Sequence, residues 1–86
     1  MKNVFEYTVT DPNGLHARPA GLLVKKTRQM PVKITMECRE GSADGKKLLA
    51  VMGLGVRNGD CLRVTVEGDM ADRYAEELKC FLEENL

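Results

Sequence analysis

Apolar and polar residues alternate in three stretches of the chain, and this period of two predicts β-strands. The stretches cover residues 5–10, 32–39 and 62–67. The second is the clearest, because its inward positions are apolar throughout and end at Cys38. A tight turn after it predicts a short further strand near residues 42–44.

Three other stretches predict helices. Residues 17–28 carry an apolar face at helical spacing, and residues 47–52 can form only a brief helix before two glycines interrupt it. A final helix follows Asp69, which suits an N-cap, and we expect its last turn to fray because Glu83 and Glu84 oppose the helix dipole. The apolar stripe of this helix, expected in the core, consists of Tyr74, Ala75, Leu78, Phe81 and Leu82.

The order of elements is therefore strand, helix, strand, strand, short helix, strand, helix. Helices on one face of an antiparallel sheet make an α+β two-layer fold. At 86 residues the chain can bury one core but is too short for two ordinary domains, so we expect a single domain over residues 1–86.

Charge and hydropathy exclude several classes of function. Thirteen basic and thirteen acidic residues balance to a formal net charge of zero, which gives no support to a general nucleic-acid or membrane-surface binder. No apolar run approaches the roughly 20 residues that a membrane helix needs, and the N-terminal residues do not resemble a signal region. We therefore expect a cytoplasmic protein without membrane insertion.

The cysteines do not predict a metal centre. Cys38, Cys61 and Cys80 are an odd number without CxxC spacing, which favours neither a disulfide framework nor a zinc site. We expect reduced thiols, with Cys38 and Cys80 packed in the core, and no metal or other cofactor.

His16, the only histidine, lies where a loop is predicted to become a helix. The first amides of a helix have no intrahelical partner and attract anions, so an imidazole here is a candidate phosphoryl acceptor. Pro19 suits the first helical turn, and Arg18 adds a donor fork that matches phosphate oxygens. The simpler alternative is that His16 merely caps the helix and Arg18 is a solvated charge.

Two motifs decide between these alternatives. The run from Gly14 to Ala20, GLHARPA, and the run from Leu48 to Val56, LLAVMGLGV, together resemble HPr, the family of histidine phosphocarriers of the bacterial sugar phosphotransferase system. The resemblance covers essentially the whole chain. It implies an open-faced sandwich in which a four-stranded antiparallel sheet is covered by three helices on one face.

The resemblance also implies a function in a relay. Enzyme I, phosphorylated from phosphoenolpyruvate, would pass its phosphoryl group to Nδ1 of His16, which would pass it to the IIA domain of a sugar permease. By motif position, Arg18 and the amides of Ala17 and Arg18 would hold the phosphoryl group, and Asn13 would orient the imidazole. Such a chain is a covalent carrier, not a free-standing enzyme, and we expect a monomer.

The resemblance further implies a partner-binding surface around the histidine. Leu48, Leu49 and Met52 lie on so short a helix that they cannot all point inward, although for Leu49 and Met52 a place in the core is as good an interpretation. The surface carried over from the family consists of Ala17, Gly21, Lys25, Arg28, Leu48, Leu49, Met52 and Gly55.

One position departs from the family pattern. Many HPr proteins carry a serine at the start of the short helix that HPr kinase/phosphorylase modifies, and Lys47 stands there in this chain. A lysine cannot accept that phosphate, so control through this site should be absent.

Another possible function is that of a regulatory interaction module of the same family, which binds a partner without acting as a carrier. The balanced charge and only four aromatic residues disfavour a small nucleic-acid-binding domain.

Overall fold

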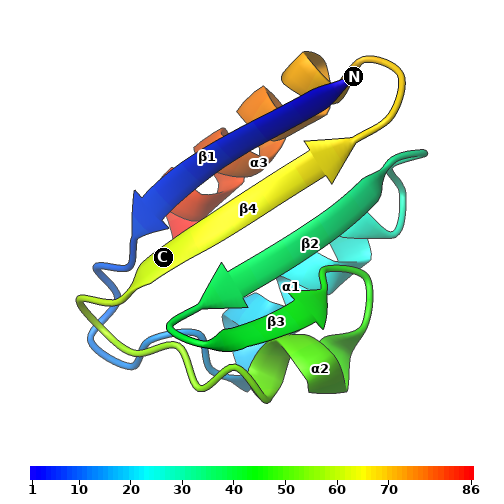
Figure 1. Cartoon of the computed structure of the whole chain (residues 1–86). Coiled ribbons are helices and arrows are strands. Elements are labelled where there is room, and N and C mark those ends of the chain that lie inside the picture. Colours follow the sequence, from blue (N-terminus) through cyan, green and yellow to red (C-terminus); the bar gives the residue numbers. More distant parts are fainter.

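A computed structural model describes all 86 residues. Seven elements follow in the predicted order (Figure 1). They are β1 (Lys2–Thr8), α1 (Ala17–Thr27), β2 (Lys33–Cys38), β3 (Gly41–Asp44), α2 (Leu48–Met52), β4 (Cys61–Glu67) and α3 (Ala71–Asn85).

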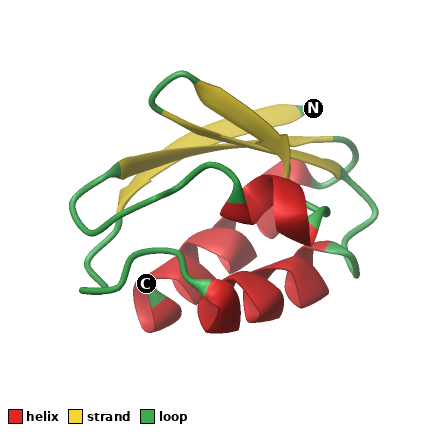
Figure 2. Ribbon diagram, turned by 90° about the horizontal axis from the view of Figure 1, so that it is seen from below, coloured by secondary structure: helices red, strands yellow, loops and turns green.

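The strands form one antiparallel sheet in the order β1-β4-β2-β3. All three helices lie on the same side of this sheet, so the molecule has two layers and one open sheet face (Figure 2). The buried residues form a single apolar cluster between the layers, to which every helix and every strand contributes. The predicted α+β open-faced fold is thereby confirmed.

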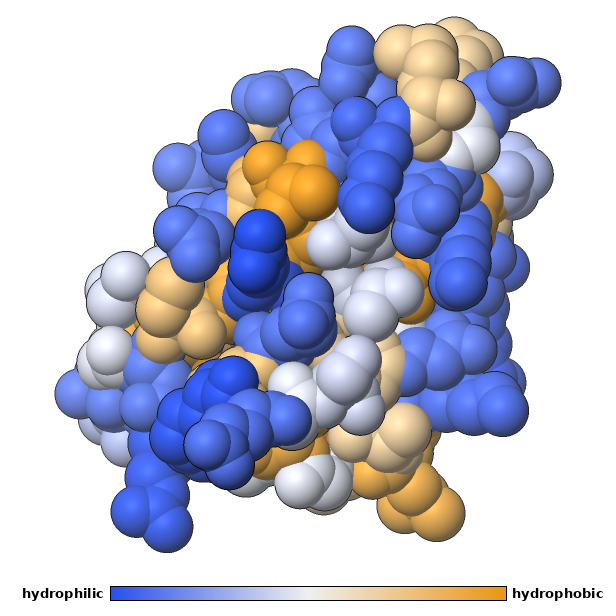
Figure 3. Space-filling view, in the orientation of Figure 1, coloured by the Kyte–Doolittle hydropathy of each residue, from blue (hydrophilic) through white to orange (hydrophobic).

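The open face of the sheet is mostly polar (Figure 3). The strand register places Arg63 of β4 between Glu6 of β1 and Glu37 of β2. Opposite charges on neighbouring strands stabilise such a register, and a one-residue shift would turn the apolar positions toward solvent. The charge pairs on this face therefore favour the observed strand register.

The last helix differs from the sequence prediction at both ends. It begins after Met70, which has a left-handed backbone with φ of 63°, so Asp69 is not its N-cap. The expected fraying of its last turn is also wrong, because Leu86 is buried and its carbonyl accepts hydrogen bonds from the amides of Thr10 and Asp11. Tertiary contacts outweigh the weak unfavourable effect of the terminal acidic residues on the dipole.

The three cysteines are free thiols in different settings. Cys38 is buried as predicted, and burial raises the pKa of its thiol, against the opposing effect of Arg39. Cys80 is exposed, so its predicted place in the core is wrong, because it lies on the solvent side of α3. No group of three potential ligands that could hold a metal ion occurs in the structure, and no helix is long and apolar enough to cross a bilayer.

Candidate phosphoryl-acceptor site

A tight turn before α1 positions the histidine. The carboxylate of Asp11 accepts a hydrogen bond from the amide of Asn13 at 2.8 Å, and the Asp11 carbonyl accepts one from Gly14 at 2.9 Å. Gly14 has φ of 64° and packs against the backbone at residues 56 and 57. A Cβ at this position would lie 2.8 Å from the Cα of Arg57, so both the conformation and the close approach require glycine.

The neighbouring loop holds the other side of this turn. Leu15 is buried, and its amide donates to the carbonyl of Val56 at 3.0 Å. The loop from β1 to α1, the loop from α2 to β4 and the end of α3 thus meet at one end of the molecule (Figure 1). His16 follows directly, at a point whose backbone is fixed from two sides.

His16 is the N-cap residue of α1, but its side chain caps nothing. Its backbone is extended, with φ of −91° and ψ of 179°, and its side chain makes no capping hydrogen bond. The amide of Ala20 donates to the His16 carbonyl, and Pro19 has no amide hydrogen. The amides of Ala17 and Arg18 therefore remain without a protein partner at the positive end of the helix dipole.

The imidazole is accessible, since 40% of the His16 side-chain surface is exposed. It lies in a surface depression of about 210 Å³, several times the roughly 30 Å³ that one water molecule occupies in the liquid. The guanidinium of Arg18 makes no hydrogen bond or ion pair, so it is free to meet an anion at the site. The depression is lined by Asp11, His16, Arg18, Pro19, Leu22 and Asn85.

Sequence analysis missed one side chain that lies beside the imidazole. Oδ2 of Asp11 lies 3.7 Å from Nε2 of His16, whereas Asn13 is exposed and its side chain makes no hydrogen bond to the ring. The Asp11 carboxylate five residues before the histidine, in a turn of Pro, Asn and Gly, was the available signal. The orienting role of Asn13 stays a prediction.

The predicted partner surface is assembled by α1 and α2, which lie side by side on the helical layer. The hydroxyl of Thr27 in α1 donates to the carbonyl of Gly45 at 2.7 Å, and Nε of Arg28 donates to the carbonyl of Lys46 at 2.8 Å. These bonds fix the segment that leads into α2. A groove of about 350 Å³ between the helices is lined by Gly21, Val24, Lys25, Arg28 and Leu48.

Every residue predicted for this surface is at least partly exposed, and the α2 residues differ in degree. Leu49 is 83% exposed, while Leu48 and Met52 pack partly against the core. In the space-filling view, an apolar projection stands out over α2 (Figure 3). The exposed or half-exposed residues are Ala17, Gly21, Lys25, Arg28, Leu48, Leu49, Met52 and Gly55.

Lys47, at the position where the sequence resemblance implies a regulatory serine, is the N-cap residue of α2. It is exposed, its backbone is extended, and its side chain makes no capping hydrogen bond. Serine is a preferred N-cap residue in this conformation, so the backbone would accept it without rearrangement.

Comparisons with known proteins match nearly the whole chain. A family model described as the PTS HPr component phosphorylation site matches residues 4–84. The phosphocarrier protein HPr of Lysinibacillus sphaericus is 39% identical over 79 residues, which are 92% of this chain and 90% of that protein. The multiphosphoryl transfer protein of Xanthomonas campestris pv. campestris is 32% identical over 79 residues, again 92% of this chain but only 9% of that larger protein.

The fold agrees with these sequence matches. The crystal structure of a phosphocarrier protein HPr from Bacillus anthracis has a TM-score of 0.87 and 27% identity, and the match covers 94% of this chain and 96% of that one. The resemblance inferred from the two motifs is confirmed. Because the family model spans residues 4–84, and a relative of similar length is 39% identical over 92% of this chain, this chain belongs to the HPr family of phosphocarrier proteins.

Proposed function

We propose that this chain accepts a phosphoryl group from enzyme I on Nδ1 of His16 and passes it to IIA domains of sugar permeases. It would act in the cytoplasm as a single-domain monomer without a cofactor. It would be a carrier and not a free-standing enzyme, because its partners would use the phosphoryl group that it holds. The observation that carries this proposal is the accessible imidazole of His16 beside the two unpartnered amides of Ala17 and Arg18.

The local chemistry supports reversible transfer. A phosphoryl group on His16 would find amide donors, the positive end of a helix of 11 residues and the guanidinium of Arg18 on the exposed side. None of these groups needs to move out of a protein hydrogen bond to receive it. Because the ring is exposed, a donor and a recipient can each approach phosphorus in line with the bond that breaks.

The surface of α1 and α2 supports docking by acidic partners. Lys25 and Arg28 present positive charge beside the apolar side chain of Leu48, and Leu49 of the same short helix is exposed. Charges at the edge of such a surface steer association, while exposed apolar side chains supply the area that is buried. Met52 adds an adaptable side chain that suits partners of different shape.

The test is incubation of the chain with enzyme I and labelled phosphoenolpyruvate, followed by transfer to a IIA domain. We expect one label per chain, labile in acid and stable in alkali, that is mapped to His16 and leaves when the IIA domain is added. The His16→Ala variant should take up no label while keeping its melting temperature, because the side chain is partly exposed and makes no capping hydrogen bond. A His16→Ala chain that is labelled as fully as the parent would refute the assignment.

A further inference from the structure

The two carboxylate oxygens of Asp11 have different partners, and this division suggests a role in the transfer. Oδ1 accepts a hydrogen bond from the Asn13 amide at 2.8 Å, which leaves Oδ2 directed toward the imidazole, 3.7 Å from Nε2 of His16. We propose that Asp11 is a positioning residue that keeps the ring proton on Nε2, so that Nδ1 carries the reactive lone pair. This inference deepens the proposed function and rests on it.

The carboxylate is held in place by its own backbone. The amide of Asp11 donates to the carbonyl of Leu86 at 2.8 Å, and its carbonyl accepts from the amide of Gly14 at 2.9 Å. Its side chain is only 24% exposed. A carboxylate fixed in this way can select one tautomer without losing the side-chain entropy that a mobile group would lose on forming the contact.

The selected tautomer matches the direction of attack. A neutral imidazole carries one proton, and the nitrogen that donates it to a hydrogen bond cannot also be the nucleophile. With the proton on Nε2 facing Asp11, the lone pair is on Nδ1. No hydrogen bond from protein to Nδ1 competes for that lone pair, because the side chain of His16 has no other polar partner.

The carboxylate also stabilises charge that forms in the reaction. The Nδ1 lone pair forms a bond to phosphorus as the donor's bond to phosphorus breaks, and the electron pair of that bond leaves with the donor. No proton is lost, so the ring becomes a phosphorylated imidazolium with its positive charge next to Asp11. When a recipient takes the phosphoryl group, the electron pair returns to Nδ1 and the ring is neutral again.

The 3.7 Å separation fits the resting state of such a pair. A neutral ring attracts the carboxylate weakly, and catalytic hydrogen bonds are often long until charge develops. We expect the contact to shorten to hydrogen-bond distance in the phosphorylated chain. The same division of labour, in which a carboxylate orients a histidine and stabilises its imidazolium, operates in hydrolase triads.

The test is Asp11→Asn, which keeps the shape of the side chain and an oxygen for the Asn13 amide. Its NH₂ group would face Nε2 and favour the lone pair there, which moves the ring proton to Nδ1. In ¹⁵N NMR at a pH where the ring is neutral, we expect the His16 nitrogen shifts to move toward the Nδ1–H tautomer. The rate of phosphorylation by enzyme I should fall about tenfold or more, with an unchanged KM for enzyme I, because the wrong tautomer blocks attack but not docking.

Asp44 offers a matched control. Its carboxylate accepts from the amide of Lys46 and its carbonyl from the amide of Lys47, the same turn that Asp11 makes, but at a distant loop. Asp44→Asn should leave the His16 ring shifts unchanged. Asp11→Ser, which can still accept from the Asn13 amide but has no charge, should lose the Nε2–H preference and serves as a second variant should Asp11→Asn fold poorly.

The outcomes separate the two proposals. Unchanged ring shifts together with an unchanged transfer rate in both Asp11 variants would overturn the role of Asp11 and leave the carrier function intact. A parent chain that takes up no phosphoryl group from enzyme I would overturn the carrier function itself, whatever the tautomer of His16.

Discussion

Around His16, three neighbours close in sequence contribute in different ways. Asp11 lies beside Nε2, the backbone amides of Ala17 and Arg18 are unpartnered, and the Arg18 side chain is exposed without a partner. Only the last of these contributions comes from a side chain that can be removed without disturbing the turn or the helix. Arg18 is therefore the residue at which transfer and stability can be separated.

Arg18→Ala should slow phosphorylation by enzyme I by about ten- to hundredfold, since a hydrogen bond to a charged group contributes about 1.5–3 kcal/mol. Its melting temperature should match the parent's, because the side chain is exposed and makes no hydrogen bond. Arg73→Ala, at a 63% exposed arginine of α3, is the control for loss of one surface charge. Transfer that is unchanged in Arg18→Ala would count against a role at the phosphoryl group.

Lys47 should make the chain resistant to HPr kinase. With ATP and the kinase, mass spectrometry should find no phosphoserine, because the N-cap of α2 carries an amine in place of a hydroxyl. Lys47→Ser should create a substrate, since the extended backbone at this position already suits a serine N-cap. Kinase-dependent phosphate on Ser42 of the parent chain, accompanied by slower transfer from enzyme I, would contradict an unregulated carrier.

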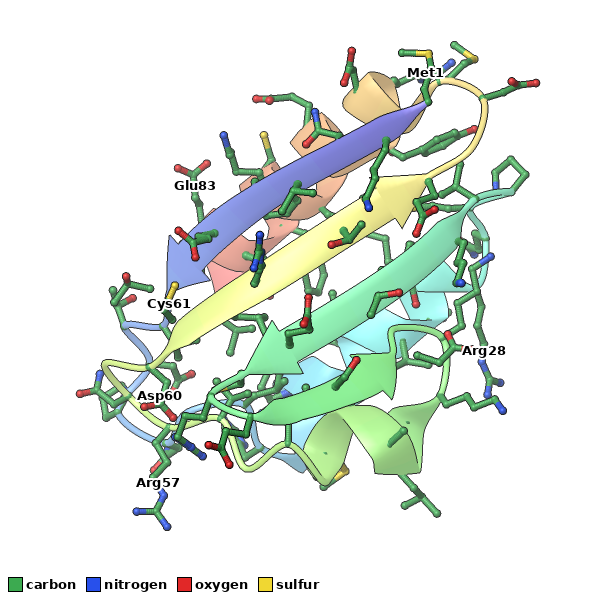
Figure 4. The ribbon with its side chains drawn as sticks, in the orientation of Figure 1. Met1, Arg28, Arg57, Asp60, Cys61 and Glu83 are labelled. Atoms are coloured by element: carbon green, nitrogen blue, oxygen red, sulfur yellow. The ribbon has the colours of Figure 1, made fainter.

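At the scale of elements, the position of α2 against α1 determines which apolar side chains remain exposed. The short helix follows a segment fixed by the hydrogen bonds that Gly45 and Lys46 accept from Thr27 and Arg28. With five residues, α2 can bury one face only, and Val51 occupies it. Leu49 then points to solvent on the other side. Arg28, which holds the segment before α2, lies at one end of the molecule, and the loop with Arg57 and Asp60 lies at the opposite end (Figure 4).

Leu49→Ala should weaken docking without weakening the fold. A side chain that is 83% exposed contributes little to stability, so we expect a change within about 0.5 kcal/mol in urea denaturation. The KM for enzyme I should rise several-fold while kcat stays the same. Val4→Thr, at a half-exposed residue on β1, is the control and should change neither constant. An unchanged KM for Leu49→Ala would exclude this residue from the docking surface.

At the scale of the whole molecule, Asp60 links segments that are distant in sequence. Its carboxylate accepts hydrogen bonds from the Arg57 amide and from the guanidinium of Arg39, and its side chain lies beside the thiol of Cys38. Asp60 and Arg57 lie together at the start of β4 (Figure 4). The Arg57 bond first, and the Arg39 guanidinium after it, hold the pKa of the Asp60 carboxyl below its usual range.

This shift predicts a pH dependence of stability. A carboxyl whose folded pKa is lowered contributes stability when ionised, above the unfolded pKa of about 3.9, and loses it as the pH falls through the folded pKa. The free energy of unfolding should therefore decrease below about pH 4, and Asp60→Asn should flatten this decrease. Asp69→Asn, at an exposed aspartate without a protein partner, is the control. An acid slope in Asp60→Asn equal to the parent's would refute this contribution.

Local patterns in the sequence were sufficient for the elements and for the place of His16 at the start of a helix. Alternation and helical spacing depend on each residue's own neighbours, so they located the strands and helices to within a few residues. The first motif is local as well, because its glycine, histidine, arginine and proline lie within six residues of the chain. These features depend on backbone preferences and burial of one face, which a sequence expresses directly.

The tertiary structure decided what depends on residues distant along the chain. The strand order, the burial of Leu86 under the β1–α1 loop and the exposure of Cys80 each follow from packing between segments. The approach of Asp11 to Nε2 of His16 has the same origin, because the turn is held by Leu86 at one end and Val56 at the other. A carboxylate in a loop is ordinary in a sequence, and only the fixed backbone on both sides makes it a partner of the histidine.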